Sequence, residues 1–438
     1  MSRRKRGAAV IAKLLKNVAV RNVLLLYVVQ FSSYLMPLIT LPYLARVLSP
    51  EKFGLVAYSQ SMMWYFVTLT DYSFNLSATR RVAIHRDDKE ELSRIFSSVM
   101  TAKTLLTLLG FAILMGTVFA IPKLRANWVL FPLSFLTVTG SWLFPLWLFQ
   151  GLQRLEQLAI RDFLAKLLGI IALFVLVHRD SDYVMAAAVQ GGSVALAGLI
   201  GLVSVPFVVQ IRWRPPTFTG VQEVLASGWP LFLSLGASSL AMTNVFIMGL
   251  YSPPAEVGYY SGAQRLIGAI RALVTPIVTA VYPHVSVKAG RSEREAVRFI
   301  QRYAVLLSGP FLLIGIAIIT AGPWVIRLVL GNKYGPSIPV IQVLALSPFL
   351  LALSHVYSTY YMLTCGYDKA WTKIMLTGVA LNFVVLFPLL YWIRGSLALA
   401  VSSLIVDVAT TALYWRFYST HAPRTDAILT PVPEDDAG

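Results

Sequence analysis

The sequence predicts an all-α polytopic membrane protein with about twelve transmembrane helices. Apolar residues make up 57% of the 438 residues, and charged residues make up only 13%. A soluble domain carries about 25% charged residues. Apolar runs of about 20 residues, long enough to cross a bilayer, recur along the whole chain. These observations exclude a soluble globular domain.

The apolar runs divide the chain into twelve expected helices joined by short polar loops. Their expected ranges are 20–46, 53–77, 95–120, 127–150, 158–178, 183–210, 227–250, 256–284, 298–320, 338–362, 371–393 and 396–418. The stretch 322–337, which contains Trp324, Gly331 and Pro336, is expected to form a short interfacial helix. Prolines inside the runs predict kinks at Pro37, Pro42, Pro276 and Pro283.

Lys and Arg residues are distributed unequally between the two sides that alternate loops define. The chain has 37 Lys and Arg residues. The two tails and the loops on the side of the tails contain 23 of them, and the loops on the opposite side contain 8. Cytoplasmic loops carry an excess of Lys and Arg, so we expect both termini to be cytoplasmic. The net charge of +17 then reflects orientation in a membrane and not binding to nucleic acid.

Two short segments repeat half a chain apart. Ser49-Pro50, Gly54 and Gln60 in the first correspond to Ser252-Pro253, Gly258 and Gln264 in the second, at an offset of 203 to 204 residues. Each segment joins the first two helices of a six-helix half, so both halves enter the membrane from the same side. The repeat predicts two lobes related by a parallel pseudo-two-fold axis, as in transporters that rock two lobes around a central site.

The expected organisation has five parts in chain order. They are a basic cytoplasmic N-terminus (1–19), an N-terminal six-helix lobe (20–211), a cytoplasmic linker (212–226), a C-terminal six-helix lobe (227–418) and a disordered cytoplasmic tail (419–438). The basic N-terminus lacks the short apolar core and small-residue cleavage site of a removable signal peptide.

The sequence carries no pattern typical of an enzyme. Its five histidines show no metal-ligand spacing, and Cys365 is the single cysteine. It has no phosphate-binding glycine loop, nucleophile elbow or zinc-protease helix. We therefore expect no catalytic residues, no metal and no cofactor.

Subtracting the 31 Lys and Arg residues assigned to the tails and loops leaves six cations embedded in the apolar runs: Arg21, Lys103, Lys166, Arg265, Arg271 and Arg302. The acids counted in the same regions are Asp71 and Asp407. A cation at the centre of a helix costs about 2.5–3.5 kcal/mol on insertion scales. Because the cations outnumber the acids, we expect a water-filled cavity that receives an anion.

The depth of each cation separates snorkelling side chains from candidate ligands. Arg21, Lys166 and Arg302 lie within about two turns of an expected cytoplasmic helix end, where long side chains reach water. Arg271 lies about fifteen residues into its helix, near mid-bilayer at 1.5 Å per residue. We expect Arg271 to carry an uncompensated charge facing a cavity. A structural ion pair with Asp407 or Asp71 is the alternative.

Three sequence motifs appear in a recognisable order. PLITLPYLARVL (37–48) leads into SPEKFG (49–54), and DYSFNLSATR (71–80) and WLFQG (147–151) follow. The chain resembles the O-antigen and exopolysaccharide repeat-unit flippases, the polysaccharide transporter branch of the multidrug/oligosaccharidyl-lipid/polysaccharide exporter superfamily. The resemblance covers essentially all twelve helices. Ser73 departs from it, since the family usually has glycine there.

The resemblance implies a flippase of the bacterial inner membrane. Its substrate would be an undecaprenyl-diphosphate-linked oligosaccharide, moved to the periplasmic leaflet by alternating access. The implied partners are that lipid, the bilayer, and a polysaccharide polymerase and chain-length regulator, with the chain itself a monomer.

A diphosphate needs Arg or Lys in a wet cavity. We expect Arg271 and Arg265 to bind it, with Lys103 and Arg21 receiving it from the cytoplasmic side. Sugars need hydroxyl, amide and aromatic surfaces, for which the candidates are Tyr58, Gln60, Tyr65 and Gln264. Asp71 and Asp407 are candidates for ion coupling or for structural pairing with the cations.

Other functions are less consistent with the sequence. A multidrug or cation antiporter of the same superfamily would need an acidic site, and the embedded charges here are mostly basic. A membrane glycosyl polymerase or ligase would need a large periplasmic loop, and the outer loops are short. A flippase for a peptidoglycan precursor or teichuronic acid stays open, since its chemistry is the same.

Overall fold

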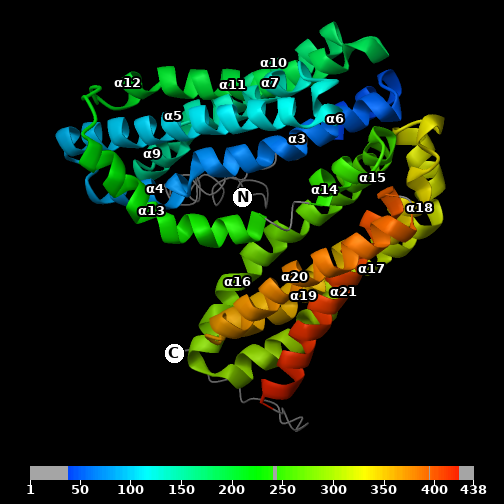
Figure 1. Cartoon of the computed structure of the whole chain (residues 1–438). Helices are drawn as coiled ribbons and strands as arrows, with labels where there is room; N and C mark the ends of the chain where they lie inside the picture. The colour runs from blue at the N-terminus through cyan, green and yellow to red at the C-terminus, as the bar shows by residue number, and fades with distance from the viewer. Residues whose placement is uncertain (1–37, 240–243, 394, 424–438) are drawn as a thin grey trace, which may run out of the picture. The chain divides into compact units, whose positions relative to one another are not determined.

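The computed structural model of the chain describes residues 38–239, 244–393 and 395–423, and this part is helical without a strand (Figure 1). The chain divides into two compact units. The first comprises Met1–Ala269, Pro323–Val340 and Pro388–Leu399, and the second comprises Ile270–Gly322, Ile341–Phe387 and Ala400–Gly438.

The described helices follow the expected apolar runs. Up to residue 239 they are Leu38–Val47, α3 (Pro50–Asp71), α4 (Phe74–Ile84), α5 (Lys89–Ala120), α6 (Pro122–Arg125), α7 (Leu130–Ser134), α8 (Leu136–Leu143), α9 (Leu146–Gly151), α10 (Leu155–Leu176), η1 (Asp180–Asp182), α11 (Tyr183–Val203), α12 (Val205–Val208) and α13 (Phe218–Ser239). From residue 244 they are α14 (Asn244–Tyr251), α15 (Pro254–Ala272), α16 (Val274–Arg291), α17 (Glu293–Val329), η3 (Asn332–Tyr334), α18 (Ser337–Leu344), α19 (Ser347–Tyr357), the π-helical turn η4 (Ser358–Leu363), α20 (Asp368–Trp392) and α21 (Gly395–His421).

Eight helical segments of the described chain are long and apolar enough to cross a membrane. They are Lys89–Ala120, Leu130–Gly151, Asp180–Val203, Pro254–Arg291, Glu293–Val329, Ser337–Leu363, Asp368–Trp392 and Gly395–His421. The protein is therefore a polytopic all-α membrane protein, as the composition predicted. The first expected helix lies largely outside the described residues.

Helix α5 begins six residues before the apolar run that predicted it. Asp88 caps it, because its side chain accepts hydrogen bonds from the backbone N–H groups of Glu90 and Glu91. The bond from Glu91 contributes most to lowering the pKa of Asp88. The cap keeps the polar first turn helical beyond the apolar run.

A tight left-handed turn separates α3 from α4. Tyr72 (φ 41°) and Ser73 (φ 64°) both adopt a conformation that favours glycine. The Ser73 hydroxyl donates to the carbonyl of Gly228 on α13 at 3.0 Å, and the Tyr72 ring stacks on Phe232. Ser73, the position where the sequence departs from the family that it resembles, thus has a left-handed backbone conformation, and its hydroxyl binds α13.

The expected helix 256–284 breaks at Leu273, where α15 ends and α16 begins. Pro276 explains the break, since it has no N–H to donate to the carbonyl of Ala272 and its ring crowds that carbonyl. Pro283 lies inside α16, where the helix continues.

The expectation of an interfacial helix at 322–337 was wrong. Helix α17 continues through Trp324 to Val329, and Gly331 (φ 92°) then ends the helical path before η3. The apolar run marked only the lipid-facing centre of a 37-residue helix.

The aromatic motif 147–151 forms part of the core of the first unit. Trp147 and Phe149 are buried with Phe74 and Phe96 in one apolar cluster. Thr79 on α4 donates to the carbonyl of Trp147 at 3.1 Å. Two of the motifs that carry the family resemblance therefore pack against each other.

The two repeated segments contact each other through their glycines. A Cβ placed on Gly54 would lie 1.8 Å from the carbonyl oxygen of Pro254, and one placed on Gly258 would lie 2.0 Å from that of Pro50. Small residues let helix backbones approach this closely in membranes. The start of α3 and the start of α15 thus form a reciprocal contact within the first unit. The six-helix lobe boundaries at 211 and 227 stay a prediction.

This reciprocal contact predicts the effect of adding one methyl group. Gly54→Ala and Gly258→Ala each force two backbones apart, so we expect each to lower the free energy of unfolding by about 1–3 kcal/mol. Thermal unfolding of the purified protein in detergent measures the effect. Gly116→Ala in α5 is the control, because a Cβ there meets nothing within 4 Å. Equal midpoints for all three variants would contradict the contact.

Candidate functional site

Lys103 of α5 is held inside the first unit by an ion pair. Its Nζ lies 3.1 Å from Oδ1 of Asp71 and donates to the carbonyl of Ser141 at 2.7 Å. The Ser141 hydroxyl donates to the same Asp71 oxygen at 2.8 Å. The Lys103 side chain is only 1% exposed, so it stabilises the end of α3 and does not face an open surface.

A second ion pair borders a cavity next to Asp71. Lys166 and Asp162, one turn apart on α10, lie 2.7 Å from each other. Both side chains line a cavity of about 210 Å³ together with Asp71, Asn75 and Ser141. Asp162 was not expected as an embedded acid, although its spacing from Lys166 is typical of a helical ion pair. Lys166 is therefore paired and not simply snorkelling.

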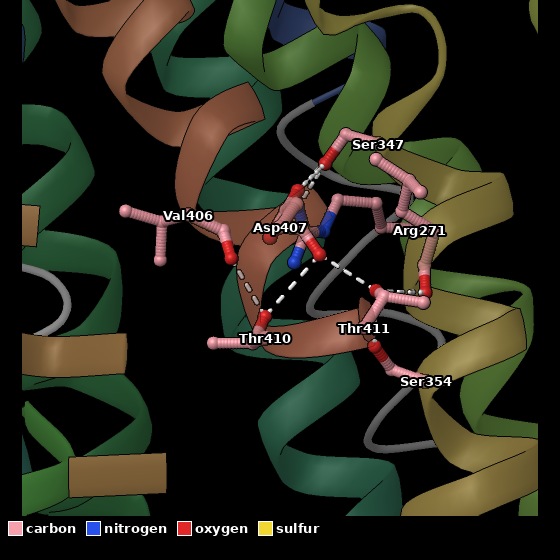
Figure 2. Close-up of polar contacts among 8 residues, drawn as sticks. Arg271, Ser347, Ser354, Val406, Asp407, Thr410 and Thr411 are labelled. Atoms are coloured by element: carbon pink, nitrogen blue, oxygen red, sulfur yellow. Dashed lines mark hydrogen bonds and ion pairs between the residues drawn. The ribbon is translucent and has the colours of Figure 1, made fainter. Parts of the chain in front are cut away.

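Arg271 is paired with Asp407 in the second unit, as Figure 2 shows. Its Nη1 lies 3.1 Å from Oδ2 of Asp407 and also donates to the hydroxyl of Ser347, which in turn donates to Asp407. Thr411 donates to the backbone carbonyl of Asp407 at 2.6 Å and shares a hydrogen bond with Ser354 (Figure 2). Helices α15, α19 and α21 each contribute a side chain to this network.

The expectation that Arg271 carries an uncompensated charge was wrong. Asp407 supplies the opposite charge, which is the alternative that the sequence left open. The pair is not sealed in packed protein, since the side chains are 36% and 23% exposed. An anion can therefore reach Arg271 only in competition with Asp407.

Unlike Lys103, Lys166 and Arg271, which each meet a carboxylate, Arg265 has neutral partners. Its Nη2 donates to Oε1 of Gln60 at 2.7 Å, and its guanidinium carbon lies 5.1 Å from the ring centroid of Phe53. Within the described ranges it forms no ion pair with a carboxylate. Arg265 is half-buried, so its charge is desolvated without being neutralised.

Gln60 links Arg265 to helix α11, all within the first unit. Its amide donates to Oε1 of Gln190 at 2.8 Å, and the Gln190 amide donates to the carbonyl of Ala186 at 3.1 Å. Gln190 was not foreseen, because no charge or motif marks it in the expected helix 183–210. This chain of amides orients the oxygen of Gln60 toward Arg265.

The remaining candidates are in different environments. Tyr58 is buried, with its ring stacked on Phe246 of α14, and Tyr65 lies edge-on to the same ring. Gln264 is exposed and lies beside Arg265 in the sequence of α15. Arg21 lies outside the described residues. Gln60 therefore lies in contact with Arg265, whereas Tyr58 is buried and does not line an open surface.

Comparison with known proteins identifies the family. A family described as "Polysaccharide biosynthesis protein" matches residues 19–287. The chain belongs to this family. It is 31% identical over 401 residues to the "Putative O-antigen transporter" of Escherichia coli (strain K12), covering 91% of this chain and 96% of that one. The protein of the same name from Shigella dysenteriae is 30% identical over 395 residues, covering 89% and 97%. The resemblance carried by the motifs is confirmed.

Two solved structures share the fold. One is described as "Lipid II flippase MurJ, inward closed conformation", with a TM-score of 0.70 and 12% identity over 91% of this chain and 87% of that one. The other is the inward-facing conformation of a multidrug resistance MATE family transporter of the MOP superfamily, with a TM-score of 0.64 and 15% identity over 88% and 95%. At these identities the likeness concerns the fold alone.

The Arg271–Asp407 pair predicts a measurable coupling. Arg271→Gln leaves the Asp407 carboxylate unpaired, and Asp407→Asn leaves the guanidinium unpaired, so each single change destabilises the fold. The double variant removes both charges, and we expect its loss to fall short of the summed single losses by about 1 kcal/mol. Thermal unfolding of the four proteins in detergent measures this coupling. Additive losses would show that the pair contributes nothing, and Arg302→Gln is a charge-matched control.

Proposed function

We propose that this chain is a flippase for a lipid-linked oligosaccharide with a diphosphate head group. It would move this lipid from the cytoplasmic to the periplasmic leaflet of a bacterial inner membrane, by alternating access, for surface polysaccharide synthesis. The family, the relatives named as O-antigen transporters and the fold shared with a lipid II flippase support the proposal. A transport role and not an enzymatic one fits all three.

The observation that carries the proposal is Arg265. A guanidinium with neutral partners inside an apolar helix is costly unless an anion binds it during the transport cycle. The planar donors of an arginine match two phosphate oxygens at once. Gln60 and Phe53 hold Arg265 through an amide oxygen and an aromatic face, contacts that a diphosphate can supplement or replace without leaving a carboxylate unpaired.

Arg271 has a second, conditional role. Its charge is neutralised by Asp407, so it contacts the head group only when that carboxylate is protonated or displaced. Asp407 is thereby a candidate for coupling transport to proton movement. Asp71, bound by Lys103 and Ser141, is assigned a structural role, and the buried Lys103 does not receive the head group.

The sugar contacts and the sidedness are also proposals. Gln264 is exposed and is available to oligosaccharide hydroxyl groups. Tyr58 contributes only after a rearrangement that separates it from Phe246. The excess of Lys and Arg in alternate loops supports cytoplasmic termini. A polymerase and a chain-length regulator would act on the translocated product.

Removing the charge of Arg265 tests the function. We expect Arg265→Gln to reduce surface polysaccharide about 10- to 100-fold, since a charge-assisted hydrogen bond contributes about 1.5–3 kcal/mol. Arg265→Lys keeps the charge and should retain part of the export. Immunoblotting of surface polymer, normalised to protein in the membrane, measures the effect in a strain that depends on this chain.

Arg302→Gln is the matched control, because it removes one cation from an exposed position on α17. Its export should equal that of the unchanged protein. Wild-type polymer levels in a strain with normal amounts of the Arg265→Gln protein would overturn the proposal.

A further inference from the structure

A second, larger cavity lies at the end of the first unit where α4 ends and α5 begins. Its volume is about 640 Å³, and its walls come from α4, α5, the extended segment before α13 and the first turn of α13. The expected topology places this end at the cytoplasmic face. The cavity is large enough for a phosphate-bearing head group, and none of the candidate residues predicted from the sequence lines it.

Three arginines from three different segments line this cavity: Arg81, Arg94 and Arg214. Arg81 and Arg94 lie 3.7 and 3.6 Å from the carboxylate of Glu91, distances beyond those of charge-assisted hydrogen bonds. Beyond these two ion pairs, neither guanidinium has a hydrogen bond in the part of the chain that the structure describes. Their donors therefore stay available to a ligand.

The third arginine is held by weak surface contacts. Arg214 lies 3.1 Å from Glu90, with the side chains 42% and 70% exposed. Exposed pairs of this kind are worth about 0–1 kcal/mol, so a phosphate can replace Glu90 at little cost. The Arg94 side chain is 64% exposed, more than that of Arg214, so a ligand can reach it as well.

Backbone contacts fix the wall that carries Arg214. The N–H of Arg214 donates to the Ser97 hydroxyl at 3.0 Å, and that of Arg212 donates to the Ser93 hydroxyl at 3.1 Å. The extended segment is therefore bound along α5 before α13 begins. This attachment presents Arg214 on the same cavity as Arg94, without help from the ion pairs.

The opposite wall is the N-terminus of the 22-residue helix α13. Thr217 accepts the backbone N–H of Gly220 at 3.1 Å, and Thr217, Thr219 and Ser98 add hydroxyl groups to the lining. The positive end of a helix favours a negative ligand. Glu91 and Glu223 also line the cavity, and their carboxylates can accept hydrogen bonds from hydroxyl groups next to a phosphate.

We propose that this cavity binds a phosphate ester that carries a hydroxylated substituent. Three guanidinium groups would hold the phosphate, and the two glutamates would accept hydrogen bonds from the substituent. Both a sugar diphosphate lipid and phosphatidylglycerol have this chemistry. If the ligand is the transported lipid, this cavity receives it before it reaches Arg265, and that identification rests on the proposed function. The proposal that the cavity binds a phosphate does not depend on the proposed function.

Equilibrium binding to the purified full-length protein in neutral detergent tests the site. The probes are farnesyl-diphospho-N-acetylglucosamine, dioleoylphosphatidylglycerol and inorganic pyrophosphate. We expect the double variant Arg94→Gln/Arg214→Gln to bind the phosphate probes about tenfold more weakly, since two charge-assisted contacts are lost. The control Arg291→Gln/Arg294→Gln removes two exposed arginines outside this cavity and should bind like the unchanged protein.

Each pattern of binding has one meaning. A loss for all three probes supports a phosphate site that accepts either head group. A loss for the diphospho-sugar without a loss for phosphatidylglycerol supports the site and assigns it to the transported lipid class. A loss for phosphatidylglycerol alone supports the site and overturns its assignment to the transported lipid. Equal affinities in the double variant and the control overturn the site.

Two further measurements keep the test decisive. If the double variant does not fold, Arg94→Gln and Arg214→Gln are titrated singly, with about a threefold loss expected for each; unchanged affinity in both overturns the site. The proposed function is tested separately by polysaccharide export from the Arg265→Gln strain. A chain that binds phosphate here but exports no lipid retains the site and loses the function.

Discussion

A cation inside lipid must find an anion, a dipole or water, and this requirement governs the polar structure of the described chain. Lys103, Lys166 and Arg271 each meet a carboxylate: Lys103 and Arg271 pair with another helix, and Lys166 pairs within its own helix. Ser141 and Ser347 complete two of these pairs by donating to the carboxylates. Among the described residues, Arg265 meets an amide oxygen and an aromatic ring and no carboxylate, which is why the proposed function rests on it.

Much of the fold could be predicted because a helix that crosses lipid must consist mainly of apolar residues. The apolar runs indicated where the membrane helices lie, and the motifs indicated the family. The helix ends were less predictable, because the runs report only the lipid-facing part of each helix. Asp88 extends α5 into its polar flank, and α17 continues at both ends of its expected range. The break at Leu273, by contrast, lies one turn before Pro276, where the sequence predicted a kink.

The site was predicted as a set of residues but not as a set of partners. Depth along the helix singled out Arg265 and Arg271 as candidates, yet depth cannot tell which carboxylate packs opposite. Asp407 is 136 residues from Arg271, so only tertiary packing decides that they meet. Asp162 and Lys166, by contrast, are four residues apart, and their pairing could have been inferred from spacing. Gln190 offered no signal, since an isolated amide in an apolar run is common.

The π-helical turn η4 follows directly after α19, the helix that supplies Ser347 to the Arg271 network. A π turn holds an extra residue relative to an α-helical turn and is frequently found at functional sites. The extra residue offsets the side chains that follow η4 by roughly one position from where an unbroken α-helix would place them. His355 and Thr359 lie on either side of the start of η4 and are joined there by a hydrogen bond of 2.9 Å. The π turn therefore sets the rotational register of the residues beyond α19 relative to Ser347.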